Sequence, residues 1–283
     1  MKIAIKNYFI LLRPQHWLKN IFLFAAPFFG GKLFLEEILL MAFPVFMAFS
    51  LCASAVYIFN DTTDIEKDRL HPRKKERPIA SGKVSKGTAL IFSALLAFIS
   101  FILAYNITPA FLYFLLLYFF IHVLYSLYLK HIAVVDIFCI ASGFVIRVLA
   151  GGGAFHVDVS KWLLLTMFMI SLVLAAGKRL GEVNMLNEKA EAHRKSLNVY
   201  SISTLNEILI ISSSASLVAY ALYTVEQFPS LVYTIPIVTF GLFRYLMLSK
   251  QGLGDPTEAM TRDKLLALTI IIWLFLIMLL RYS

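Results

Sequence analysis

Nine long apolar segments restrict the fold of this chain more than any other feature. They lie at residues 18–34, 37–59, 87–105, 107–129, 133–155, 161–178, 204–224, 229–249 and 265–281. At roughly 1.5 Å per residue and with some tilt, each can cross a hydrocarbon core of about 30 Å. None shows the alternating hydrophobicity of a membrane β-barrel. We therefore predict an all-α integral membrane protein with about nine transmembrane helices, although Pro27, Gly30 and Gly31 interrupt the first segment.

The composition agrees with a membrane protein, and the charges predict its orientation. The chain is 60% hydrophobic and 15% charged, with a mean hydropathy of +0.79, which is too apolar for a soluble domain of 283 residues. If the N-terminus is cytoplasmic, all but four of the 26 Lys and Arg residues fall on the cytoplasmic side. The exceptions are Lys32, Lys161 and Arg281, on the opposite side, and Arg147, within a span.

The same pattern predicts the organisation and location of the chain. We find no internal repeat and no separable second domain, so we expect one transmembrane domain over residues 1–283. The charge bias predicts that two loops, around residues 60–86 and 178–203, lie at the cytoplasmic face of the cell inner (plasma) membrane, and we expect these loops to carry the active site. The net charge of +9 fits this bias together with anionic lipids or phosphorylated substrates, and we expect no nucleic-acid partner.

A densely charged run, NDTTDIEKDRLHPRKKERPIASG, separates the second and third segments. Asp61, Asp64 and Asp68 follow one another at helical spacing, so on a continuous helix they project within an arc of roughly 60°. Three carboxylates on one face repel one another unless cations lie against them, and such oxygen ligands suit Mg²⁺ holding phosphates. Basic donors suited to phosphate follow directly, among them Arg69, Lys74 and Arg77. A solvated loop that only fixes topology is the alternative for the basic residues alone.

This run resembles the first aspartate-rich motif, NDxxDxxxD, of the UbiA-type intramembrane prenyltransferase superfamily, and Asn60 and the three aspartates fill its fixed positions. The resemblance implies a UbiA-like helical bundle in which these aspartates are catalytic residues that bind Mg²⁺ and a substrate diphosphate. Asn60 would orient a ligand or a water molecule.

Other segments resemble one branch of that superfamily, the decaprenyl-phosphate phosphoribosyltransferases. The matching segments are RPQHWLKN, DRLHPRKKERPIASG, GFVIRVLAGG, GKRLGEVNML and the region after residue 249. The resemblance adds further substrate-binding candidates: Lys19, Asn20, Arg69, Lys74, Arg77, Arg147, Lys178, Arg179 and Glu182. Tyr125 and Lys130 are candidates because their segment, YSLYLKHIAVVD, resembles the tyrosine and lysine segment after the fourth helix of the wider superfamily. For His71 a structural or helix-capping role is the expected one.

Several of these residues also have a purely structural interpretation. Lys19 and Tyr125 could belong to an aromatic and basic belt at the membrane interface, and Lys130 could do the same. Arg147 lies in the middle of a span and needs an anionic partner, which is either a protein carboxylate or a ligand phosphate. We expect Asp136 to form a salt bridge with Arg147 or Lys130. The glycines after Arg147 allow close approach, either of another helix or of a substrate.

The end of the sixth segment departs from the wider superfamily. Prenyl-diphosphate enzymes carry a second aspartate-rich motif there, whereas this chain has Lys178, Arg179 and Glu182. One acidic and one basic cluster suit a metal-bound diphosphate together with additional phosphates. By the resemblance, the chain transfers 5-phosphoribose from 5-phosphoribosyl 1-diphosphate to a polyprenyl phosphate of the decaprenyl type. The product would be a precursor of lipid-linked pentose for cell-envelope polysaccharide.

Three alternatives stay open at this point. A prenyltransferase acting on an aromatic acceptor would need the second aspartate cluster. A lipid-phosphate transporter would bind the same ligands without chemistry, and we expect it to show pseudo-symmetric halves. An assembly scaffold would not explain three carboxylates on one helical face. A homo-oligomer is compatible with each.

Overall fold

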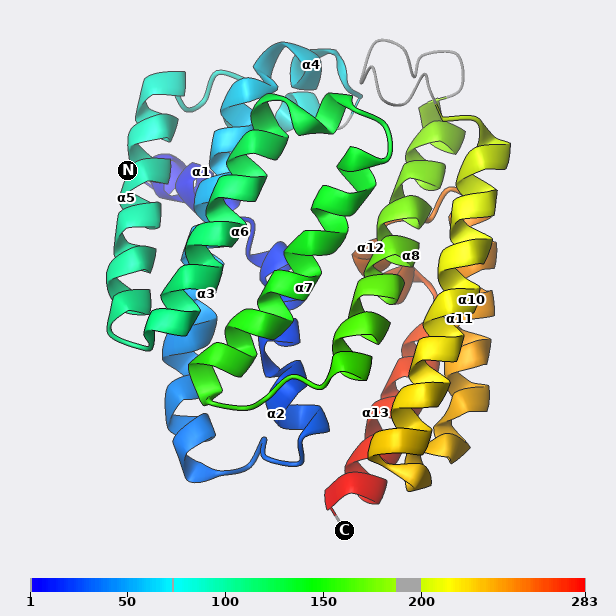
Figure 1. Ribbon diagram of the computed structural model, residues 1–283. Helices are drawn as coiled ribbons and strands as arrows, with labels where there is room; N and C mark the ends of the chain where they lie inside the picture. Colours follow the sequence, from blue (N-terminus) through cyan, green and yellow to red (C-terminus); the bar gives the residue numbers. More distant parts are fainter. Residues whose placement is uncertain (1, 73, 187–199, 283) are drawn as a thin grey trace. The chain divides into compact units, whose positions relative to one another are not determined.

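A computed structural model of the chain describes residues 2–72, 74–186 and 200–282. These residues form helices and connecting turns without a β-strand, which confirms the predicted all-α membrane fold (Figure 1). The chain divides into two compact units, the first comprising residues 1–130 and 146–158 and the second residues 131–145 and 159–283. Helix α7 (Val135–Phe155) therefore contributes its first half to the second unit and its second half to the first.

The first unit is built around one long helix, α3 (Glu36–Thr63). The other elements of this unit are α1 (Lys2–Leu12), η1 (Pro14–Phe24), α2 (Ala25–Phe29), α4 (Ile65–Leu70), η2 (Lys74–Glu76), α5 (Lys86–Tyr105) and α6 (Pro109–Leu127). Buried serines of α5 tie it to α3: Ser93 donates to the carbonyl of Ala55 and Ser100 to that of Ala48, at 2.8 and 2.7 Å. Such bonds help helices associate in a membrane, where apolar side chains gain little by leaving lipid.

The second unit contains the remaining long helices. They are α8 (Lys161–Leu186), α10 (Ile202–Gln227), α11 (Ile235–Lys250) and α13 (Lys264–Tyr282), with the short elements η5 (Pro229–Thr234) and α12 (Pro256–Arg262). The short element η3 (Leu129–His131) lies at the boundary, and only its last residue, His131, belongs to this unit. Helix α8 approaches the turn after α11 very closely, because a Cβ on Gly254 would lie 1.9 Å from the carbonyl oxygen of Gly177. Tyr245 fixes the same turn by donating to the carbonyl of Gly254 at 2.7 Å. Gly252 and Gly254 thus lie in this turn, and Pro256 begins α12.

Among the described residues, eight helices are long and apolar enough to cross a membrane. The first predicted span is different, because it is divided into η1 and α2 and ends at Gly30 and Gly31, the latter with φ of 70°. A 3₁₀ helix rises about 2.0 Å per residue, so η1 and α2 together still cover about 30 Å. Figure 1 shows α1 and α4 at one end of the first unit and α2 at the other, so this segment also passes along the unit's length.

Polar side chains hold η1 against α3. Trp17 donates to Ser54 at 3.0 Å and Asn20 donates to Ser50 at 2.9 Å. Helix α7 also approaches η1 closely, because a Cβ on Gly151 would lie 1.7 Å from the carbonyl oxygen of Leu23. The glycines after Arg147 thus allow close backbone packing, one of the two roles expected of them.

Candidate active site

The three aspartates lie where helix α3 passes into α4. Asp61 belongs to α3, Asp68 belongs to α4, and Asp64 lies at the break between them with φ of −104° and ψ of 13°. The predicted continuous helix is therefore interrupted. Helical hydrogen bonds nevertheless continue across the break, from the Asp64 N–H to the Asn60 carbonyl at 3.1 Å and from the Asp68 N–H to the Asp64 carbonyl at 2.8 Å. These bonds preserve the helical spacing that the sequence indicated.

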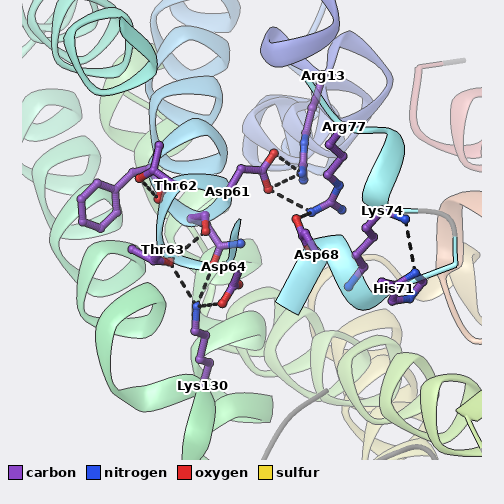
Figure 2. Close-up of polar contacts among 12 residues, drawn as sticks. Arg13, Asp61, Thr62, Thr63, Asp64, Asp68, His71, Lys74, Arg77 and Lys130 are labelled. Atoms are coloured by element: carbon purple, nitrogen blue, oxygen red, sulfur yellow. Dashed lines mark hydrogen bonds and ion pairs between the residues drawn. The ribbon is translucent and has the colours of Figure 1, made fainter. Parts of the chain in front are cut away.

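Two arginines from other segments reach Asp61 and Asp68 (Figure 2). Nη2 of Arg13 lies 2.6 Å from both carboxylate oxygens of Asp61. Nη1 of Arg77 lies 3.0 Å from Asp61 Oδ1 and 2.7 Å from Asp68 Oδ2. One guanidinium nitrogen thus bridges two carboxylates, which brings both side chains to a common point.

Asp64 has a different partner. Nζ of Lys130 lies 2.7 Å from Asp64 Oδ1, and it also approaches Thr63 Oγ1 at 3.3 Å and Asn60 Oδ1 at 3.4 Å (Figure 2). Lys130 is only 2% exposed, so it is not a membrane-interface anchor. The expected salt bridge of Lys130 with Asp136 is wrong, because Lys130 is used here, next to the aspartate motif.

Burial affects the chemistry of Asp68. It raises the pKa of this carboxyl above its ordinary value, the positive charges of Arg77 and Lys74 oppose that rise, and the negative charge of Asp61 adds to it. A carboxylate that is both desolvated and next to a second carboxylate needs cations nearby to stay ionised. Arg77 and Lys74 supply that charge from within the chain.

The donor chemistry of this cluster suits a hard divalent cation, although the described residues contain no group of three His, Cys, Asp or Glu side chains already arranged around one point. Nη1 of Arg77 lies between Asp61 and Asp68 and bonds both carboxylates. Asp61 and Asp68 therefore fit a metal ion once Arg77 moves, and Asp64 does so once it leaves Lys130.

The basic loop after the aspartates is ordered by its own contacts. Arg69 donates to the Ala80 carbonyl at 3.2 Å and pairs with Glu66 at 2.9 Å, so it stabilises the loop. His71 Nδ1 accepts from the backbone N–H of Lys74 at 3.3 Å, which is the structural role expected of it. Arg73 lies outside the described residues. Of the loop cations, Arg77 contacts the aspartates directly and Lys74 acts on Asp68 through its charge.

A second polar group lies within the spans of the first unit. Arg147 is buried, donates to Asn20 at 2.8 Å and to Tyr118 at 3.1 Å, and lies over the Phe49 and Tyr118 rings. The expected salt bridge of Arg147 with Asp136 is therefore wrong. Cation–π contacts and neutral hydrogen-bond acceptors surround this guanidinium.

The half-buried candidates Lys19 and Tyr125 lie beside His122 in the same unit. The charge of Lys19 acts on the His122 imidazole, and the Tyr125 ring lies 6.2 Å from it. Their predicted contacts with substrate stay predictions.

In the second unit, Arg179 is the centre of a network that we call closed, because Asp136 and its partners Arg179 and Tyr200 are buried. Arg179 Nε lies 2.6 Å from Asp136 Oδ2, and Arg179 Nη1 pairs with Glu182. Tyr200 donates to Asp136 Oδ1 at 2.7 Å and accepts from the Val134 N–H at 2.5 Å. Burial and the bond to Asp136 raise the pKa of Tyr200, so its hydroxyl remains a donor. Asp136 is thus held by Arg179, because both face the interior of this unit.

Lys178 lies beside this network and pairs with Asp255 at 3.5 Å. Both side chains are partly exposed, at 34% and 25%, so this contact is weak and exchangeable. Of the predicted cluster at the end of α8, Lys178 is therefore the cation best placed to meet a ligand. Residues 187–199 of the predicted loop lie outside the described part of the chain.

Sequence reasoning missed two residues of these sites. Arg13 was not among the predicted site residues, although Ser50, Ser54, Tyr57 and Asp61 recur at spacings of three and four along α3 and form a polar face that requires a partner. Arg13 meets this face at Asp61 and lies over the Tyr57 ring. Tyr200 was missed because only the tertiary structure brings it to Asp136.

Comparison with known proteins identifies the family of this chain. The model of the UbiA prenyltransferase family matches residues 21–269. The decaprenyl-phosphate phosphoribosyltransferase of Mycobacterium tuberculosis is 35% identical over 272 residues, which cover 93% of this chain and 90% of that protein. The enzyme of the same name from Corynebacterium glutamicum is 32% identical over 284 residues, with 96% and 85% covered.

Solved structures agree at the level of the fold. A UbiA homolog from Archaeoglobus fulgidus, solved with GPP and Mg²⁺, superposes with a TM-score of 0.73 at 17% identity, over 98% of this chain and 100% of that chain. The family match extends over both compact units and includes the aspartate motif of α3 and α4. This chain belongs to the UbiA prenyltransferase family.

Proposed function

We propose that this chain transfers 5-phosphoribose from 5-phosphoribosyl 1-diphosphate to a polyprenyl phosphate of the decaprenyl type, with release of diphosphate. The observation that carries the proposal is that the chain has one aspartate-rich motif and, at the end of α8, basic residues in place of a second one. The first unit presents Asp61, Asp64 and Asp68 with basic partners, whereas α8 presents Lys178 and Arg179 where a prenyl-diphosphate enzyme has its second acidic motif. The names of the relatives that are 32–35% identical support the same substrates.

We infer that Mg²⁺ is the metal and that Asp61 and Asp68 hold it, with Asp64 as a further ligand. When bound there, Mg²⁺ would neutralise charge that grows on the leaving diphosphate. Residues of the chain bind and orient the donor. Arg77 and Lys130 donate to diphosphate oxygens, and Asn60 and Thr63 keep Lys130 in place. The acceptor phosphate is already anionic, so its oxygen attacks C1 of the ribose without a strong general base.

The remaining cations are proposed to hold the other two phosphates, the 5-phosphate of the donor and the phosphate of the acceptor. They are Lys19, Lys74, Arg147 and Lys178, with Arg179 and Glu182 positioning the end of α8. Asn20 keeps Arg147 oriented. The positive charge of the loops supports an active site at the cytoplasmic face of the inner membrane, where a water-soluble sugar diphosphate and a membrane lipid could both reach it.

The test is transfer of label from phosphoribosyl diphosphate into the lipid phase, in detergent with Mg²⁺ and polyprenyl phosphate. We expect EDTA to abolish transfer and Asp61→Asn or Asp64→Asn to reduce it by about 100-fold or more, because loss of a group that stabilises developing charge typically costs that much. Glu66→Gln is the matched control: Glu66 is an exposed carboxylate of α4 whose partner is Arg69.

Two results would contradict the proposal. Folded protein that puts no label into lipid, but transfers a prenyl group to an aromatic acid, would be a prenyltransferase. Folded protein that binds both substrates and turns over neither would instead be a transporter.

A further inference from the structure

The aspartates of the first unit are already neutralised by side chains of the protein itself. Arg13 contacts both oxygens of Asp61, and Arg77 bridges Asp61 and Asp68, so two carboxylates and two guanidiniums form one neutral group. Asp61 is 4% exposed, whereas Arg13 and Arg77 are 13% and 27% exposed. The carboxylates are therefore fixed in the protein interior, while the arginines retain access to solvent.

This arrangement opposes the binding of a metal ion by itself. A divalent cation that approaches Asp61 and Asp68 meets Nη1 of Arg77 at the bridging point and finds no net negative charge. To bind, it must displace a guanidinium that then lacks its anion in a partly buried site, which costs free energy. A diphosphate supplies that anion, because guanidinium groups bind phosphate oxygens as they bind carboxylates.

The backbone conformation of Arg13 is an independent indication that its side chain has a role at a ligand site. Arg13 lies at the break between α1 and η1 with φ of 52° and ψ of 56°, a left-handed conformation that is uncommon outside glycine. Strained backbone of this kind persists where the surrounding structure requires it, and it clusters at ligand sites. Here it delivers a guanidinium to Asp61.

We propose that Arg13 and Arg77 exchange partners when the donor binds. Both guanidiniums move from the aspartates to the diphosphate of the donor, and the metal ion replaces them at the aspartates. Metal and diphosphate then bind as one unit, and each binds weakly alone. Arg13 thereby becomes a substrate-binding residue that pairs with a metal ligand until the donor arrives. This inference rests on the proposed function only in assigning a diphosphate to the aspartate site.

The exchange predicts opposite changes in two affinities, that for a metal ion alone and that for diphosphate. Arg13→Gln and Arg77→Gln remove the competing cation, so each should tighten the binding of Mn²⁺ alone, by about 5-fold or more, within the usual range of coupling between two sites. The same variants should weaken the binding of diphosphate in the presence of metal by a comparable factor. Mn²⁺ affinity is measured from the electron paramagnetic resonance signal of free hydrated Mn²⁺, and diphosphate affinity by equilibrium dialysis of labelled inorganic diphosphate.

Lys83→Gln is the matched control, because Lys83 is an exposed cation of the same loop and its loss changes the net charge equally. We expect it to leave both affinities unchanged. A purely structural arginine would not tighten metal binding when removed, so unchanged or weaker Mn²⁺ affinity in both variants overturns the exchange. If one variant fails to fold, as judged by gel filtration, the other still gives the sign. Neither assay uses phosphoribosyl diphosphate or lipid, so its outcome is independent of whether phosphoribose is the group transferred.

Discussion

In the first unit, the arginines that neutralise Asp61 and Asp68 come from other segments and are 13% and 27% exposed, whereas in the second unit Arg179 and Asp136 are 1% and 0% exposed. Both clusters contain the same chemical groups. In the second, Asp136 and both of its bonded partners, Arg179 and Tyr200, are buried. In the first, one nitrogen of Arg77 is shared between two carboxylates, so each carboxylate can exchange this bond for a stronger ligand. For these arginines, burial of the guanidinium thus separates a structural network from an exchangeable one.

The largest expected effect comes from breaking the closed network. Arg179→Met leaves the Asp136 charge buried without its guanidinium, which typically costs about 3–5 kcal/mol. The matched change in the open cluster, Arg77→Met, should cost less, because Asp61 keeps its bonds to Arg13 and Arg77 itself is partly exposed. Thermal unfolding in detergent, followed by size exclusion, compares the two. Equal losses of stability would remove the distinction between the clusters.

A smaller effect is expected from the element that carries Arg13. In Gly151→Ala the new Cβ would overlap the Leu23 carbonyl, so η1 or α7 must shift, at a cost of about 1–3 kcal/mol. Because η1 also positions Arg13, transfer activity should fall together with stability. Gly87→Ala is the control, since the methyl group added there would meet no neighbouring atom within 4 Å and alanine favours the helix. An active, stable Gly151→Ala protein would contradict the close contact between η1 and α7.

The smallest effect is expected for a partly exposed pair of the second unit, Arg244 with Asp263, whose closest atoms are 2.5 Å apart. The hydrogen bond from Arg244 and then that from the Leu266 N–H hold the pKa of Asp263 below its ordinary value of about 3.9. A lowered carboxyl pKa stabilises the fold above the ordinary pKa, and this contribution is lost as the pH falls through the folded-state pKa. Asp263→Asn should therefore lower the melting temperature slightly at pH 7, and the difference from the parent should shrink below about pH 4. A difference that grows on acidification would contradict this sign.

Much of the fold was predictable because the membrane restricts it so strongly. Long apolar segments in lipid can satisfy their backbone polar groups only as helices, so eight spans followed from the sequence alone. The first segment was not predicted as the mixed element it is. Its form depends on Trp17 and Asn20 meeting serines of α3 and on Gly151 admitting the Leu23 backbone.

The sequence by itself determined where the acidic site lies, because Asp61, Asp64 and Asp68 are close along one helical stretch and local spacing controls their direction. Only the tertiary structure decided which cations face them. Arg13 is 48 positions from Asp61, Lys130 is 66 from Asp64 and Arg179 is 43 from Asp136, and periodicity carries no information over such separations. Charge pairing in the membrane interior is set by which helices pack together, and that packing follows from contacts summed over whole elements.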